Sequence, residues 1–283
     1  MNKLCIGTVQ FGLKYGVNNQ SGVPNYEIIE QILNFAYDKN ISFLDTANVY
    51  GDAQLKIGKL HHNRFKIVGK FPILNSSANL KSEFQKTLLQ LNTNSIYGYI
   101  AHDANNLISK PELWVTLKEL KTNKQIKKIG YSLYYPEQLN ELLSLNLIPD
   151  LVQLPFSLLD RKFEQYFEQL KKLGTEIHVR SVFLQGLYFI NPLNLPNKLK
   201  CLKSELIQLH NICKEYQIDI NTLALNYTNS NSYIDKVVIG IDNISQLEKN
   251  WQSLNKIKFN PDLISAVNKI EVRQEKLLNP ANW

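Results

Sequence analysis

The chain has 283 residues, of which 44% are hydrophobic and 20% charged, and its formal net charge is +7. These proportions are ordinary for a globular protein with its own core. No apolar run approaches the ~18 residues that a membrane span needs, and no recognition motif accompanies the scattered lysines. We therefore expect neither a membrane nor a nucleic acid as partner.

The three cysteines, Cys5, Cys201 and Cys213, lack the spacing of a disulfide framework or of a zinc site. The first residues carry neither a long apolar stretch nor a small-residue cleavage site, so we read no signal peptide. Together these features predict a cytoplasmic protein that uses no metal. The sequence does not indicate an oligomeric state.

Short apolar segments alternate with amphipathic segments from one end of the chain to the other. The apolar segments predict strands, and the segments between them carry apolar residues at helical spacing. Strands are predicted at residues 4–8, 42–46, 65–70, 95–103, 128–132, 150–156, 176–183 and 236–240. Helices are predicted at residues 25–40, 52–60, 79–92, 110–123, 136–146, 162–174 and 244–254. A longer, mostly helical stretch is predicted over about 197–229, and a terminal helix and tail over 260–277.

About eight strand–helix units follow one another with no break in composition. Strands this apolar, each followed by a helix, predict a parallel sheet whose outer face is covered. Eight such units close most simply into a (β/α)8 TIM barrel, an α/β fold in which residues 1–283 form a single domain. A doubly wound open sheet is the alternative, but it usually carries a G-x-G-x-x-G turn, and this chain has none.

Polar residues occur where the predicted strands end, which is the face of a barrel that carries active sites. Each has a structural explanation of its own, such as a helix cap, a surface lysine or a packed tyrosine or histidine. Their convergence on one rim favours a functional role. The residues are Asp45, Lys70, His102, Ser132, Gln153, Arg180 and Ser181, with Tyr50 in the loop after Asp45.

Four of these residues form a plausible group for carbonyl reduction. A tyrosine is a weak acid at neutral pH, and a nearby lysine is expected to lower its pKa. Asp45 would hold Lys70 in its charged form, and Lys70 would tune Tyr50. Tyr50 would then protonate a carbonyl oxygen as a general acid, while a neutral His102 orients the substrate. A nicotinamide cofactor would supply the hydride.

At this point the sequence resembles the aldo-keto reductase family, in a compact bacterial-type form. The motifs follow the family's order over nearly the whole chain, one at each successive strand end. The core D-T-A-x-x-Y-G followed by a strand that ends in lysine is highly specific. The motifs are GTVQFG, FLDTANVYGDAQLKIGKL, IVGK, AHD, IGYSLYYPEQL, VQLPFSLLDR and GIDNISQLEKN.

The resemblance implies a catalytic tetrad, a nicotinamide cofactor and a small carbonyl substrate. The tetrad would be Asp45, Tyr50, Lys70 and His102. The family mostly uses NADPH, and NADH is possible. The residues that the resemblance places around the cofactor are Gly7, Thr8, Ser132, Gln153, Arg180, Ser181, Gly186, Gly240, Gln246 and Asn250.

The chain departs from the family pattern in three places. Leu133 stands where the family often has asparagine, and Arg180 stands where a tyrosine commonly stacks on the nicotinamide. Gly240 and Gln246 stand where lysine and arginine commonly bind the 2′-phosphate. We therefore expect weak discrimination between the two nucleotides, with NADPH slightly preferred, and an anionic or sugar-like carbonyl substrate.

Two other functions remain open at the level of sequence. A barrel aldolase would use Lys70 to form a Schiff base, although an adjacent carboxylate disfavours the neutral amine that this chemistry needs. A regulatory protein would bind the cofactor without turning it over, although it would not need a complete tetrad.

Overall fold

The computed structural model of the chain describes residues 2–17, 19, 21–254 and 261–283. Its centre is a closed barrel in which each strand pairs in parallel with the next, and β1 pairs with β8 to complete the ring. The predicted barrel is confirmed, and the open sheet is wrong. The strands are β1 (Leu4–Gly7), β2 (Phe43–Asp45), β3 (Lys66–Phe71), β4 (Ile96–Ala101), β5 (Ile126–Ser132), β6 (Leu151–Pro155), β7 (Glu176–Arg180) and β8 (Lys236–Gly240).

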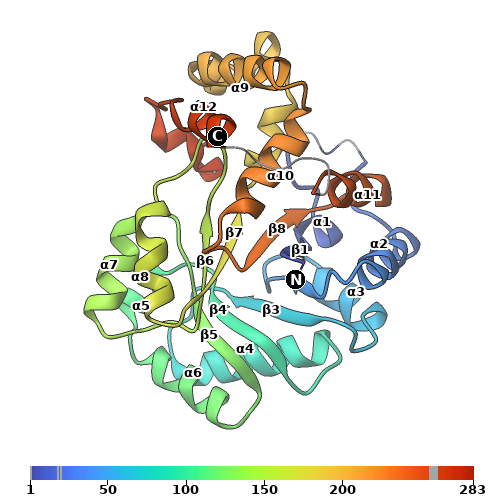
Figure 1. The fold of residues 1–283 in the computed structure, drawn as a ribbon. Helices are drawn as coiled ribbons and strands as arrows, with labels where there is room; N and C mark the ends of the chain where they lie inside the picture. Colours follow the sequence, from blue (N-terminus) through green and yellow to red (C-terminus); the bar gives the residue numbers. More distant parts are fainter. Residues whose placement is uncertain (1, 18, 20, 255–260) are drawn as a thin grey trace.

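Helices surround the barrel and cover its outer face, as Figure 1 shows. The α-helices are α1 (Val9–Gly12), α2 (Tyr26–Asp38), α3 (Ala53–Leu60), α4 (Ser77–Gln90), α5 (Asn105–Ser109), α6 (Leu113–Thr122), α7 (Pro136–Ser144), α8 (Phe167–Lys172), α9 (Lys203–Glu215), α10 (Ile220–Ser230), α11 (Ile244–Ser253) and α12 (Pro261–Asn268). The 3-10 helices are η1 (Glu164–Tyr166), η2 (Leu184–Phe189), η3 (Pro192–Asn194), η4 (Asn197–Leu202), η5 (Glu275–Leu278) and η6 (Pro280–Asn282).

The mostly helical stretch predicted over about 197–229 is confirmed, and it consists of more than one helix. It is divided into η4, α9 and α10, because Gln217 adopts a φ of 53° and Asp219 then caps a new helix by accepting from the Thr222 N–H. The seventh strand, predicted over 176–183, is shorter than predicted. It ends at Arg180, because Ser181 takes a φ of 62°. Asn260, where the predicted terminal helix begins, lies outside the described residues.

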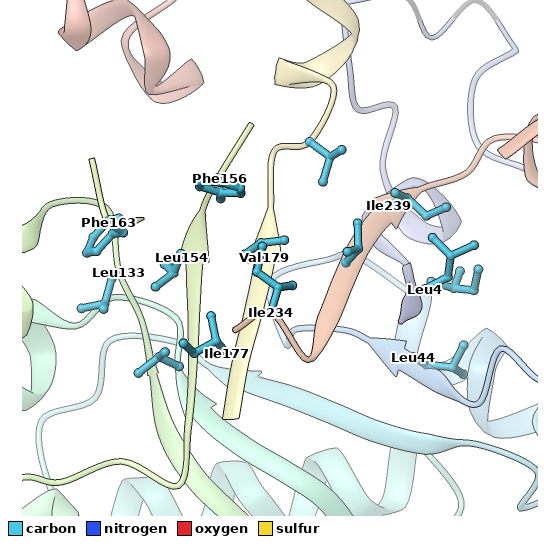
Figure 2. Close-up of a cluster of buried hydrophobic side chains, with 14 of the residues drawn as sticks. Leu4, Leu44, Leu133, Leu154, Phe156, Phe163, Ile177, Val179, Ile234 and Ile239 are labelled. Atoms are coloured by element: carbon cyan, nitrogen blue, oxygen red, sulfur yellow. The ribbon is translucent and has the colours of Figure 1, made fainter. Parts of the chain in front are cut away.

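The strands bury side chains on both of their faces, which explains their near-continuous apolar sequences. Figure 2 shows one part of the outer core, where Leu154, Ile177 and Val179 extend from β6 and β7. Side chains of opposite parity point into the barrel, where Cys5, Phe43, Val68, Ile100, Leu151 and Val238 form a separate buried cluster.

The same alternation places Gln153 and Arg180 on the inner side of their strands, since their neighbours Leu154 and Val179 belong to the outer core. Register then fixes which inner residues meet, and Ser132 lies beside Gln153 across β5 and β6. The fold thus gathers polar side chains at the carboxyl ends of the strands. None of the helices in the described residues is long and apolar enough to cross a membrane.

Candidate active site

A cavity of about 630 Å³ opens at the carboxyl ends of the strands. Its size is typical of a pocket for a small molecule or cofactor. All of the residues predicted from the sequence as catalytic or cofactor-binding line this cavity: Gly7, Thr8, Asp45, Tyr50, Lys70, His102, Ser132, Gln153, Arg180, Ser181, Gly186, Gly240, Gln246 and Asn250.

Lys70 and Asp45 form a buried ion pair in the cavity wall. Lys70 is the second-last residue of β3 and Asp45 is the last residue of the neighbouring β2, and the ammonium donates a hydrogen bond to Asp45 Oδ1. Their side chains are 1% and 4% exposed. The second oxygen, Oδ2, accepts a hydrogen bond of 2.7 Å from Gln153 Nε2. Both carboxylate oxygens therefore have a donor, which a buried charge requires.

Tyr50 lies in the turn after β2, with its ring close to Lys70 and His102. Lys70 Nζ lies 5.3 Å from the centre of the phenol ring, and the His102 ring lies edge-on to it at 5.7 Å. Two glycines allow this position. A Cβ on Gly12 would lie 1.9 Å from the Tyr50 carbonyl oxygen, and Gly51 has a φ of 58° that favours glycine.

The expected lowering of the Tyr50 pKa is wrong for this structure. Burial, and then the negative charge of Asp45, raise the pKa of Tyr50 well above its ordinary value, while Arg180 opposes the shift. Lys70 cannot act as an uncompensated cation, because its charge is balanced by Asp45. The phenol is therefore held in its protonated form, which is the form that a proton donor needs.

His102 follows β4 and is kept neutral by its surroundings. Burial, and then the nearby Lys70 charge, lower the pKa of His102 to about 4. A neutral imidazole at physiological pH can donate one hydrogen bond and accept another. This agrees with the expectation of a neutral histidine beside the phenol.

Arg180 lies on the cavity wall and stacks on a second tyrosine that the sequence analysis did not single out. Its guanidinium carbon is 4.3 Å from the centre of the Tyr134 ring. It donates 2.9 Å to the Leu133 carbonyl and 3.3 Å to Ser181 Oγ. These partners are uncharged, and the ion pairs of the described residues do not include Arg180. Among the described residues, the Arg180 charge therefore has no carboxylate partner.

The far end of the cavity, after β8, holds a group of amides and one carboxylate. Asp242 accepts from Asn19 Nδ2 and from Gln246 Nε2, each at 3.1 Å. Gln10, on α1, lies over Gly240, and its Oε1 atom is buried without a hydrogen-bond partner among the described residues. Lys249 also lines this end of the cavity.

These features fit a nicotinamide dinucleotide. The unpartnered buried oxygen of Gln10 can accept a hydrogen bond from a ligand. A Cβ on Gly7 would lie 3.1 Å from Val238, and one on Gly240 would displace Gln10, so both positions let the backbone line the cavity closely. The N-terminus of α11, capped by Asn243, adds backbone N–H groups that suit a phosphate.

Sequence reasoning missed several residues of the cavity. Asn19 and Asp242 are 223 positions apart, so their contact had no local signal. Gln10 stands inside the motif GTVQFG, but only the neighbouring glycine and threonine were singled out. Tyr15 Oη accepts a hydrogen bond of 2.5 Å from Gln185 Nε2, which brings the loop before α2 against the segment after β7.

An eight-stranded parallel barrel whose polar groups gather at the carboxyl ends of the strands has the arrangement in which barrel enzymes carry their active sites. Residues 3–272 match the sequence model of a protein family described as "Aldo/keto reductase family". The chain belongs to this family.

Individual relatives are distant but cover most of the chain. The "Uncharacterized oxidoreductase YqkF" of Bacillus subtilis (strain 168) is 24% identical over 261 residues, covering 83% of this chain and 85% of its own. The holo form of aldo-keto reductase AKR11C1 from Bacillus halodurans has a TM-score of 0.76 at 22% identity, covering 97% and 95%. A thermostable aldo-keto reductase, Tm1743, in complex with the inhibitor epalrestat, has a TM-score of 0.68 at 20% identity, covering 95% and 94%.

Proposed function

We propose that the chain reduces an aldehyde or ketone to an alcohol with a nicotinamide dinucleotide as hydride donor, and that Tyr50 is the general acid. The observation that carries this proposal is the position of a protonated Tyr50 against the buried Lys70–Asp45 pair, with His102 edge-on to the same ring. The dinucleotide, when bound, supplies the hydride.

The residues of the chain divide the remaining work. The burial that raises the pKa of Tyr50 keeps its proton available for a carbonyl oxygen. Neutral His102 donates a hydrogen bond to the same oxygen and orients it. The Lys70 ammonium, fixed by Asp45, stabilises negative charge as it develops on the phenol oxygen. Asp45 in turn is fixed by Gln153.

Arg180 supports a substrate with an anionic group close to its carbonyl. Its guanidinium faces the cavity, and the hydrogen bonds that the structure describes use only part of its five donors. Its charge also opposes the rise in the pKa of Tyr50 and adds to the lowering of the pKa of His102, as expected for a cation near both groups. A carboxylate or phosphate on the substrate would complete its bonding.

A screen of aldehydes, ketoacids and sugars with NADH and NADPH in parallel tests this function, with the loss of reduced nicotinamide absorbance as readout. We expect turnover on at least one compound and none with the Tyr50→Phe variant. Nucleotide binding without turnover on any compound would favour a regulatory protein. A borohydride-trapped adduct at Lys70 would favour an aldolase, which the Lys70–Asp45 pair argues against.

A further inference from the structure

The cavity has two chemically different ends. At one end, Tyr50 follows β2, Lys70 lies near the end of β3 and His102 follows β4. The other end, at and after the close of β8, is lined by Gly240, Asp242, Gln246, Lys249 and Asn250. Under the proposed function, the ring that donates hydride must lie at the first end, where Tyr50 and His102 meet the carbonyl. The adenosine half of a dinucleotide then extends along the cavity to the second end.

The second end carries a carboxylate that is fixed in place. The Asp242 backbone N–H donates 2.9 Å to Gln246 Oε1, and the Gln246 amide returns a hydrogen bond to Asp242 Oδ2. Asn19 Nδ2 donates a hydrogen bond to the other oxygen, Asp242 Oδ1, and a second one to the Gly22 carbonyl. A carboxylate has about four acceptor positions, so each oxygen of Asp242 can accept one more hydrogen bond.

Gln10 occupies the space above Gly240. A Cβ at position 240 would lie 2.2 Å from Gln10 Nε2, so a longer side chain at this position would collide with the amide. Gln10 is only 9% exposed. Its buried Oε1 has no partner among the described residues, and leaving such an acceptor unpaired costs stability. The uncharged amide of Gln10 therefore fills the space that a cationic side chain at position 240 would need.

Lys249 is the cation that could oppose this arrangement. It lies on α11 and lines the same end of the cavity, but it is exposed to solvent. An exposed ammonium gains little from a single anionic partner. Asp242, in contrast, is partly buried and held by two amides. Among the described residues, the side-chain charge that is fixed at this end of the cavity is therefore negative.

From these contacts we propose that the cavity selects a ribose with free 2′- and 3′-hydroxyls, so that the chain takes NADH in preference to NADPH. This inference rests on the proposed function, since the nicotinamide must lie at Tyr50. Ribose hydroxyls donate to Asp242, as they do to acidic residues in dinucleotide-binding sheets. A 2′-phosphate carries about two negative charges, offers few donors and meets Asp242 with repulsion. This reverses the weak preference for NADPH that was expected from the sequence.

Fluorescence titration of the protein with each nucleotide, without substrate, tests the inference. We expect NADH to bind about tenfold or more tightly than NADPH. Adenosine 5′-monophosphate should displace bound NADH at lower concentration than adenosine 2′,5′-bisphosphate, because these fragments probe the adenosine end alone. Asp242→Asn should move the ratio of the two dissociation constants about tenfold toward NADPH. Glu248→Gln, which removes an exposed charge from the same helix, should not move it.

The outcomes separate this inference from the proposed function. NADPH bound as tightly as NADH, or a ratio that Asp242→Asn changes no more than Glu248→Gln does, would overturn the inference alone. Binding of neither nucleotide would overturn both. Tight, selective binding of NADH without reduction of any carbonyl compound would leave the inference standing and remove the proposed function.

Discussion

The Gln153 amide donates a hydrogen bond of 2.7 Å to the Asp45 carboxylate from across the barrel, on β6 rather than on a neighbouring strand. Replacing Gln153 with leucine leaves Asp45 Oδ2 without this donor. Because the oxygen is buried, we expect unfolding free energy to fall by about 1–3 kcal/mol. Urea unfolding at pH 7 measures this. Gln165→Leu, at an exposed position on η1, serves as the control and should change neither stability nor turnover.

Tyr50→Phe removes the proposed proton donor and keeps the ring that contacts His102. We expect turnover to fall by about 10²-fold or more, as for the loss of a general acid, while the dissociation constant for the nucleotide stays the same. Steady-state rates and nucleotide titration measure the two quantities. Tyr37→Phe, at an exposed position, is the matched control. Wild-type turnover in Tyr50→Phe would remove the assigned mechanism.

Lys70→Met leaves the Asp45 carboxylate buried with Gln153 as its donor. Breaking a buried pair on one side typically costs about 3–5 kcal/mol, so this variant should unfold at lower denaturant concentration. The double variant Asp45→Asn/Lys70→Met removes both charges and should recover much of that stability. We expect it to remain inactive. Activity in the refolded double variant would show that the pair serves only the fold.

The His102 side chain should make the protein less stable in mild acid. Its pKa is about 4 in the folded chain and near 6.5 when unfolded, so the unfolded state binds more protons between these values. Stability therefore falls as pH drops from 7 toward 5. Unfolding curves should show that, from pH 7 to pH 5, the free energy of unfolding falls by roughly 1–2 kcal/mol more for the wild type than for His102→Gln. Equal losses would mean that His102 titrates normally.

Arg180→Met removes the guanidinium and keeps an unbranched side chain. If Arg180 binds an anionic substrate group, KM for a ketoacid should rise by about tenfold or more, and KM for an uncharged aldehyde should change little. The dissociation constant for the nucleotide, measured without substrate, should stay within about twofold. A change confined to nucleotide binding would assign Arg180 to the cofactor instead.

The parts of the molecule that sequence predicted well were those with a local signal. The alternation of apolar strands and amphipathic helices indicated the barrel, and the strand-end positions of Asp45 and Lys70 indicated their meeting. Gln153 and Asn19 reach their partners across the barrel and between distant loops, so spacing carried no information about them. The predicted lowering of the Tyr50 pKa was wrong because the burial that raises it depends on the whole fold, which the sequence motif does not show.

The layer of Cys5, Val68, Ile100, Leu151 and Val238 closes the inside of the barrel below the cavity. In the proposed reaction, each turnover consumes the Tyr50 proton, and a layer of apolar side chains offers no chain of donors and acceptors to replace it from below. The replacement proton must then enter through the same mouth as the substrate. We therefore expect that Tyr50 cannot exchange protons with solvent while product fills the cavity. Tyr50 is then protonated again only after the product leaves.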